Sequence, residues 1–197
     1  MYTQLNSDGW EFQEEKQGVK LYTKLDEKTG LNLVRGEGVI NAPASKIMET
    51  ALNLSENKEW DDTVEEGRLI EKSDNTYVIY NLLKRVGLLK RRESLTVFQP
   101  YNEEDGTIYG VGTSIEHPSV PKTNDLLRIN VRMAGWVLRP LKDNPNKTFA
   151  TYILHADPQG WIPKKIINWV MGEQAMNVRK IGNYVEKKFW GYRTMSQ

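Results

Sequence analysis

A long helical pattern near the end of the chain constrains the fold more than any other feature. It follows a turn at 157–160, and Pro163 suits the first turn of a helix because its missing N–H would have no partner there. Residues at steps of three and four then form one stripe: Ile167, Val170, Met171, Gln174, Val178, Ile181, Val185 and Phe189. We therefore expect one continuous helix, ending near Phe189, that covers an apolar surface.

The opposite side of this predicted helix mixes cations with large apolar side chains: Lys165, Trp169, Met176, Lys180 and Lys187. One interpretation is an ordinary C-terminal helix with a few exposed apolar residues. The other is a lid that covers a cavity with one face and meets a membrane with the other.

Composition narrows the class of protein. The 197 residues are enough for one domain with a buried core, and a net charge of +1 without a basic tail argues against nucleic acid as a partner. There is no cysteine, which excludes disulfides and thiol chemistry. No stretch has the pattern of a signal peptide or a membrane-spanning helix, so we expect a cytoplasmic protein.

Alternating apolar and polar residues predict a sheet in the rest of the chain. After a short helix or turn at 9–12, strands at 18–25 and 31–40 form a hairpin, and two helices follow at 43–52 and 54–60. Further strands are expected at 64–72, 76–83, 94–100, 107–116, 126–138 and 147–156. A run of strands followed by one long helix favours an α+β fold with an antiparallel sheet, and such a helix commonly encloses a cavity.

Short motifs occur along the chain in a specific order: Gly9-Trp10-Glu11, Gly18-Val19-x-Leu21-Tyr22, Asp26-x-Lys28-Thr29-Gly30-Leu31, Ala42-Pro43, Trp60-Asp61, Arg92-Glu93, Leu138-x-Pro140-Leu141 and Gly160-Trp161-Ile162-Pro163-Lys164-x-Ile166-Ile167-Asn168. With these motifs, the chain from Gly9 to Lys188 resembles a StAR-related lipid-transfer (START) domain. The last motif looks most like the steroidogenic acute regulatory branch, and the motif at 26–31 looks more like the phosphatidylcholine-transfer branch.

The resemblance implies a helix-grip fold, in which a curved antiparallel β-sheet wraps around a long C-terminal α-helix. It also implies that one lipid occupies the tunnel between them. We expect a single START domain over residues 1–197, with an ordered core at about 9–189 and a flexible tail at 190–197.

The loop at 82–92 predicts membrane contact without help from the resemblance, because its apolar tip stands between basic residues. Each cation near an anionic membrane surface contributes about 1 kcal/mol, and the tip can then enter the interface. The alternative is that Leu88 and Leu89 pack inward beneath the loop. In START domains this loop lies beside the C-terminal helix, so the resemblance implies a membrane gate made of Val86, Leu88, Leu89, Lys90, Arg91 and Trp169.

The family's specific head-binding groups are missing. Asn57 stands where the phosphatidylcholine carrier has an arginine, and Asn81 and Phe98 stand where the sterol branch has a buried acid–base pair. A neutral amide and an aromatic ring leave no charge unpaired, which is physically consistent. Neither choline phospholipid nor sterol can therefore be carried over as the ligand, and whether Tyr80 or Asn81 points inward stays open.

Two registers are also open for the strand at 126–138. Plain alternation turns Ile129, Val131 and Met133 inward, whereas a match to the phosphatidylcholine carrier turns Arg132 and Ala134 inward, where Arg132 would need an anion. The candidate lipid-binding residues are Tyr80, Asn81, Thr96, Phe98, Arg132, Met133, Ala134, Ile167, Val170, Met171, Gln174, Val178 and Ile181.

Catalytic patterns are weak in this sequence. His117 and His155 are the two histidines, no spacing predicts a metal site, and we interpret Trp60-Asp61 as a packing tryptophan and a capping acid. We expect a monomeric, non-enzymatic carrier without a cofactor, which moves one lipid between membranes and associates with them peripherally. The alternatives are a lipid-sensing module that binds a protein partner and a polyketide cyclase-like enzyme of the same superfold.

Overall fold

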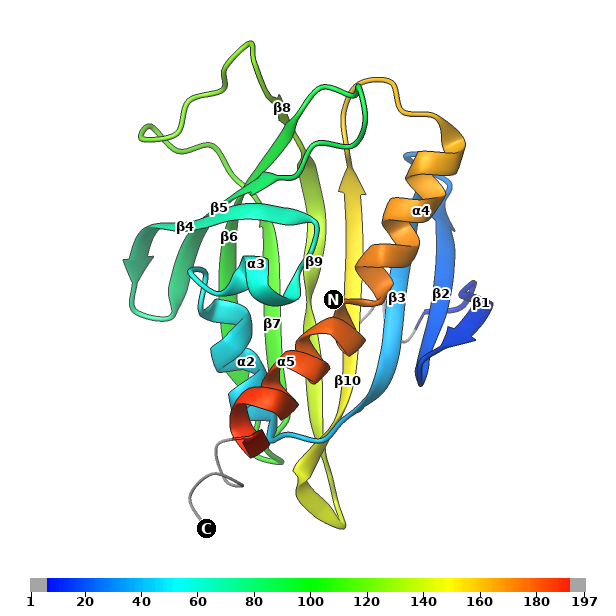
Figure 1. The fold of residues 1–197 in the computed structure, drawn as a ribbon, viewed down its shortest axis with the longest axis vertical. Helices are drawn as coiled ribbons and strands as arrows, with labels where there is room; N and C mark the ends of the chain where they lie inside the picture. Colours follow the sequence, from blue (N-terminus) through cyan, green and yellow to red (C-terminus); the bar gives the residue numbers. More distant parts are fainter. Residues whose placement is uncertain (1–6, 192–197) are drawn as a thin grey trace.

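The computed structural model describes residues 7–191, in which a long antiparallel sheet carries helices on one face (Figure 1). The strands are β1 (Glu11–Lys16), β2 (Val19–Asp26), β3 (Leu31–Ile40), β4 (Val64–Ser73), β5 (Thr76–Leu83), β6 (Arg92–Asn102), β7 (Ile108–Ser114), β8 (Leu127–Arg128), β9 (Asn130–Leu141) and β10 (Asn144–Asp157). The helices are α2 (Ala44–Leu52), α3 (Asn57–Trp60), α4 (Lys164–Ala175) and α5 (Asn177–Gly191).

Long-range pairing joins the N-terminal strands, at one end of the sheet, to the last strand of the chain. The strand order is β1-β2-β3-β10-β9-β7-β6-β5-β4, and the short β8 pairs in parallel with β6. The last strand, β10, therefore lies between β3 and β9, and the chain passes directly from it towards the closing helices. The predicted α+β fold with an antiparallel sheet and a C-terminal helix packed on it is confirmed.

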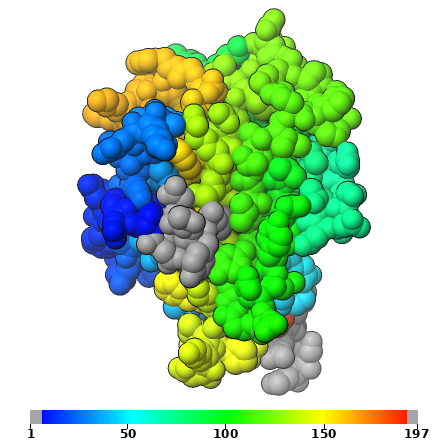
Figure 2. All heavy atoms as spheres, turned by 180° about the vertical axis from the view of Figure 1, so that it is seen from behind, coloured from blue at the N-terminus to red at the C-terminus, as the bar shows by residue number. Residues whose placement is uncertain are grey.

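The apolar core lies between the inner face of the sheet and α2 and α5. Its fully buried members include Val19, Ile40, Ile47, Leu138, Val178 and Ile181. Seen from behind, strands from both halves of the chain form one broad outer surface, and α5 is almost completely hidden (Figure 2). The helices consequently cover one face of the sheet, which is the side on which a cavity can form.

The closing helix is divided at Met176, which corrects the prediction of one continuous helix. α4 ends at Ala175, whose carbonyl oxygen lies directly over Gly36 of β3, and α5 starts at Asn177. Met176 is only 6% exposed and belongs to the core, so its predicted place on the outer side of the helix is also wrong. Before this break α4 packs against β2, β3 and β10, and after it α5 packs against β3, β10, α2 and α3 (Figure 1).

Three element boundaries also differ from the predictions. The short helix or turn expected at 9–12 belongs in part to the edge strand β1, and the strand expected at 126–138 is divided into β8 and β9. Trp190 and Gly191 belong to α5 instead of the predicted tail, where the indole of Trp190 donates to the carbonyl of Asn41. The remaining tail residues, 192–197, lie outside the described part of the chain. None of the helices within residues 7–191 combines the length and apolar character needed to cross a membrane.

Candidate functional site: a cavity beneath α4

A cavity of about 980 Å³ lies between the inner face of the sheet and α4. Its walls come from β5, β6, β9 and β10, from α3 and the residues after it, and from the loop at 84–92. The apolar part of the wall includes Ile79, Phe98, Val131, Trp136, Leu154 and Met171. Ligand sites in proteins commonly measure ~300–1,000 Å³, so this cavity is at the upper end of that range.

Eight of the candidate lipid-binding residues line this cavity. Asn81, Thr96 and Phe98 come from β5 and β6, Ala134 comes from β9, and the others come from α4: Ile167, Val170, Met171 and Gln174. The fold therefore brings together residues of β5, β6, β9 and α4 that are up to 93 positions apart, from 81 to 174.

Tyr80 lies on the outer face of the sheet, and Asn81 lies on the inner face. The ring of Tyr80 is 4% exposed and packs with Val78 and Leu95, with the Arg68 guanidinium 4.4 Å from the ring centre. Asn81 lines the cavity. Of these two neighbours, Asn81 is therefore the one that points inward.

A β-bulge at Arg132 explains why both registers proposed for β9 were partly right. Along β10, His155 pairs with Met133 but the next residue, Ala156, pairs with Val131, so Arg132 is the extra residue. Val131 before the bulge and Ala134 after it both line the cavity. Arg132 is exposed on the other side. Burial of the imidazole lowers the pKa of His155, the Asp26 carboxylate acts in the opposite direction, and the charge of Arg132 adds a smaller lowering effect. Neither Arg132 nor Met133 is among the residues that line the cavity.

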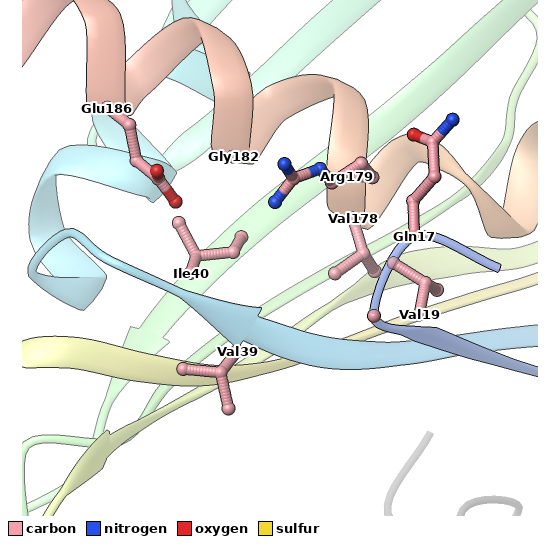
Figure 3. Close-up of a pocket in the computed structure, with 9 residues that line it drawn as sticks. Gln17, Val19, Val39, Ile40, Val178, Arg179, Gly182 and Glu186 are labelled. Atoms are coloured by element: carbon pink, nitrogen blue, oxygen red, sulfur yellow. The ribbon is translucent and has the colours of Figure 1, made fainter. Parts of the chain in front are cut away.

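Val178 and Ile181 lie beyond the cavity because the break at Met176 redirects the helical stripe. Both are buried in the core between α5 and the sheet. Val178 instead lines a smaller pocket of about 230 Å³, formed by the turn between β1 and β2, by β3 and by α5 (Figure 3). Arg179 and Glu186 lie at the side of this pocket that α5 provides (Figure 3).

The loop at 84–91 forms one rim of the cavity and divides its leucines between two environments. Leu88 is 98% exposed, whereas Leu89 lines the cavity together with Val86, Lys90 and Trp169. Arg91 does not line the cavity, and it forms an ion pair with Glu65. Trp161, 80% exposed in the turn before α4, was missed as a candidate, although an aromatic residue in the turn before the closing helix is a signal that the sequence offered.

The cations assigned to the outer side of the closing helix differ in their surroundings. Lys165 is exposed. Lys180 is not free, because its ammonium group lies 2.5 Å from Asp62 and 2.7 Å from Glu173. One cation of the mixed cationic and apolar face expected on the sequence is therefore held in structural ion pairs.

A group of hydrogen-bonding side chains at α3 and the break between α4 and α5 was not anticipated. Thr63 donates to the Asp61 carboxylate through its backbone N–H (3.0 Å) and its hydroxyl (2.6 Å). The Asn177 amide donates to the same carboxylate at 3.5 Å, and the Tyr152 hydroxyl donates to Gln174 at 3.3 Å. All five side chains line the cavity, so Asp61 is a wall residue as well as the residue that follows α3.

Burial controls the ionisation of this group. It raises the pKa of the Asp61 carboxyl, while hydrogen bonds from Thr63 and the charge of Lys180 act in the opposite direction. Burial and the nearby Asp61 also raise the pKa of the Tyr152 hydroxyl, which stays protonated and able to donate. Within residues 7–191, no group of three or more His, Cys, Asp or Glu side chains is arranged to hold a metal ion.

We predict that Asp61→Asn removes the pH dependence of stability that the raised pKa of this buried carboxyl group produces. Between the usual pKa of 3.8 and the raised pKa in the folded state, the folded state binds more protons than the unfolded state. The free energy of unfolding should therefore fall as the pH rises through this window in the wild type, and less so in the variant. Urea unfolding at several pH values measures this, and parallel pH profiles would contradict it.

Comparison with known proteins gives the family. A sequence model described as START domain matches residues 2–185. StAR-related lipid transfer protein 5 of Bos taurus is 24% identical over 191 residues, covering 94% of this chain and 90% of that protein. The mitochondrial steroidogenic acute regulatory protein of Homo sapiens is 25% identical over 188 residues, and the match spans 93% of this chain but only 64% of that relative.

Solved structures agree in fold. Human StAR-related lipid transfer protein 5 superposes with a TM-score of 0.84 at 22% identity, covering 95% of this chain and 91% of that one. The Zhui aromatase/cyclase from Streptomyces sp. R1128 superposes with a TM-score of 0.53 at 9% identity, covering 80% and 94%. At these identities the likeness concerns the fold alone. Because the family model covers almost the whole chain, this protein belongs to the START domain family.

Proposed function

We propose that this protein binds one lipid in the cavity beneath α4 and transfers it between membranes without catalysing a reaction. The observation that carries the proposal is the largely apolar cavity of about 980 Å³ between the sheet and α4. Relatives of this chain are lipid transfer proteins by name. Burial of apolar surface supplies the affinity, at about 25 cal/mol per Å².

In this proposal the loop at 84–91 and the start of α4 form the membrane gate of a monomeric carrier. Leu88 and Trp161 are exposed apolar groups, and Lys84, Arg85 and Lys164 are exposed cations that line the cavity rim. Such a surface fits the interface of an anionic membrane, and its partial insertion would give a lipid access to the cavity.

Native mass spectrometry of the purified protein tests the proposal, followed by extraction of what co-purifies and by a transfer assay between vesicles. One lipid per protein and net transfer would support it. A protein that stays empty and takes up no lipid from a broad panel would refute it. Stoichiometric binding without transfer would instead favour the lipid-sensing alternative.

We predict that Leu88→Asp weakens binding to anionic vesicles by about tenfold and leaves the thermal midpoint unchanged. The side chain is almost fully exposed, so its replacement removes membrane insertion without opening a hole in the core. Leu69→Asp is the matched control, because Leu69 is 49% exposed on the edge strand β4, outside the cavity rim. Co-sedimentation with vesicles measures both variants, and an equal loss in the control would contradict the gate.

A further inference from the structure

The cavity has one polar end, which we define by five side chains: Asn57, Trp60, Asp61, Asn81 and Asn177. Two of these side chains approach the same position on β4, Gly67, which has no side chain of its own. A methyl group added there would lie 3.2 Å from Asn81 Oδ1 and 3.5 Å from Asn57 Nδ2. Hydrogen bonds at α3 connect Asp61 to two of the asparagines. The backbone N–H of Asp61 donates to the Asn57 carbonyl, and the Asp61 carboxylate accepts from the Asn177 amide.

Several buried polar atoms of this end have no hydrogen-bond partner among residues 7–191: Asn57 Oδ1, Trp60 Nε1, Asn81 Oδ1 and Asn177 Oδ1. The Asn57 and Asn177 side chains belong to residues that are only 7% and 2% exposed. Buried polar groups are normally satisfied, so unpartnered atoms on a cavity wall indicate where a ligand's polar group binds. Three acceptors and one indole donor match a group that both donates and accepts, as a hydroxyl does.

The distribution of charge argues against an anionic head at this end. Within the described residues, the cations that line the cavity are Lys84, Arg85, Lys90, Arg92 and Lys164, which belong to the loop at 84–91, to the first residue of β6 or to the first residue of α4. Arg92 donates to the carbonyl oxygens of Pro158 and Gln159, at 2.9 and 3.1 Å. A phosphate at the polar end would meet the Asp61 carboxyl and no lining cation.

We propose that the ligand is a neutral lipid with a free hydroxyl group, and that the polar end of the cavity binds this hydroxyl through Asn57, Asn81 and Asn177. The hydroxyl donates to a carboxamide oxygen and accepts from the Trp60 indole or a carboxamide N–H. Its hydrocarbon body lies along the apolar wall towards α4. This inference rests on the proposed lipid-binding function and names the class of lipid.

Matched lipids test the inference. A short-chain diacylglycerol is compared with its acetyl ester and with the corresponding phosphatidic acid, and cholesterol is compared with cholesteryl methyl ether. Trp60, Trp136 and Trp169 line the cavity, so intrinsic fluorescence follows binding. We expect at least one free-hydroxyl lipid to bind at least about tenfold more tightly than its capped or phosphorylated partner, because capping leaves buried acceptors unpaired. If the diacylglycerol set shows the difference, the hydroxyl belongs to a glycerolipid, and if the cholesterol pair shows it, the hydroxyl belongs to a sterol.

Substitutions at the polar end test whether its asparagines cause the preference for a free hydroxyl group. Asn57→Leu, of similar size, should reduce the preference for the free hydroxyl by about fivefold or more and leave binding of the capped lipid unchanged. Asn102→Leu is the control, because Asn102 is exposed at the end of β6 and away from the cavity. If Asn57→Leu does not fold, Asn81→Leu provides the same comparison.

The outcomes separate the two proposals. Equal binding of free and capped lipids, or tightest binding of phosphatidic acid, would overturn the hydroxyl inference and leave lipid binding intact. No binding of any lipid would overturn the proposed function, and the inference with it. A tenfold preference in the wild type that persists unchanged in a folded Asn57→Leu or Asn81→Leu variant would place the hydroxyl away from the polar end and overturn the assignment.

Discussion

Replacing Ala134 by Trp is expected to weaken lipid binding about 50-fold while the fold stays intact. Ala134 lines the cavity from β9, so the indole would occupy space in which the proposed lipid chain lies. If it displaces roughly three methylene groups at about 0.8 kcal/mol each, the loss is about 2.4 kcal/mol. Lipid titration followed by fluorescence measures the affinity, and circular dichroism measures the fold.

Arg132→Trp is the matched control for this prediction. Arg132 is two residues away on the same strand, but the β-bulge leaves it exposed and outside the cavity. The control should bind lipid as the wild type does. Equal affinity of Ala134→Trp and the wild type would show that the lipid does not occupy this part of the cavity.

Gly36→Ala is expected to lower the free energy of unfolding by about 2–3 kcal/mol, one of the largest losses available from a single added methyl group. The new carbon would lie 2.1 Å from the Ala175 carbonyl oxygen and 2.8 Å from the Ala175 carbonyl carbon. Both atoms belong to the backbone at the end of α4, so no side-chain rotation can relieve the clash. The helix junction must move away from β3, and urea unfolding measures the cost.

Gly172→Ala, within α4, provides the opposite expectation. A methyl group at Gly172 meets no atom of the described chain within 4 Å apart from the neighbouring backbone of α4, and alanine favours a helix by about 0.5–1 kcal/mol over glycine. This variant should be slightly more stable than the wild type.

A Gly36→Ala protein with wild-type stability would contradict the first of these two stability predictions. It would mean that the junction of α4 and α5 does not rest on β3.

Periodic patterns predicted most strands of the sheet and the helix α2, because alternation and helical spacing are local properties of the chain. The stripe on α4 also identified Ile167, Val170, Met171 and Gln174, which line the cavity. The edge strand β1 was missed because all six of its residues are exposed and its pattern carries no buried face.

The site depends on contacts that sequence spacing does not encode. Asp61 follows a Trp in a short motif that predicts packing and capping, and only the fold brings it to Asn177, 116 positions later. The unpartnered Asn57 and Asn81 oxygens likewise become a candidate binding site only because β4 carries Gly67 between them.

The sequence alone determined the α+β class, the amphipathic closing segment and the family, since these depend on local periodicity and on motif order. Tertiary structure decided which face each residue occupies. The bulge at Arg132 reverses the alternation of β9, and the contact of Ala175 with Gly36 accompanies the break that turns Val178 away from the cavity. Both features arise from packing between segments far apart in the chain. A pattern that repeats every two or 3.6 residues depends on neighbouring residues only, so it does not predict that packing.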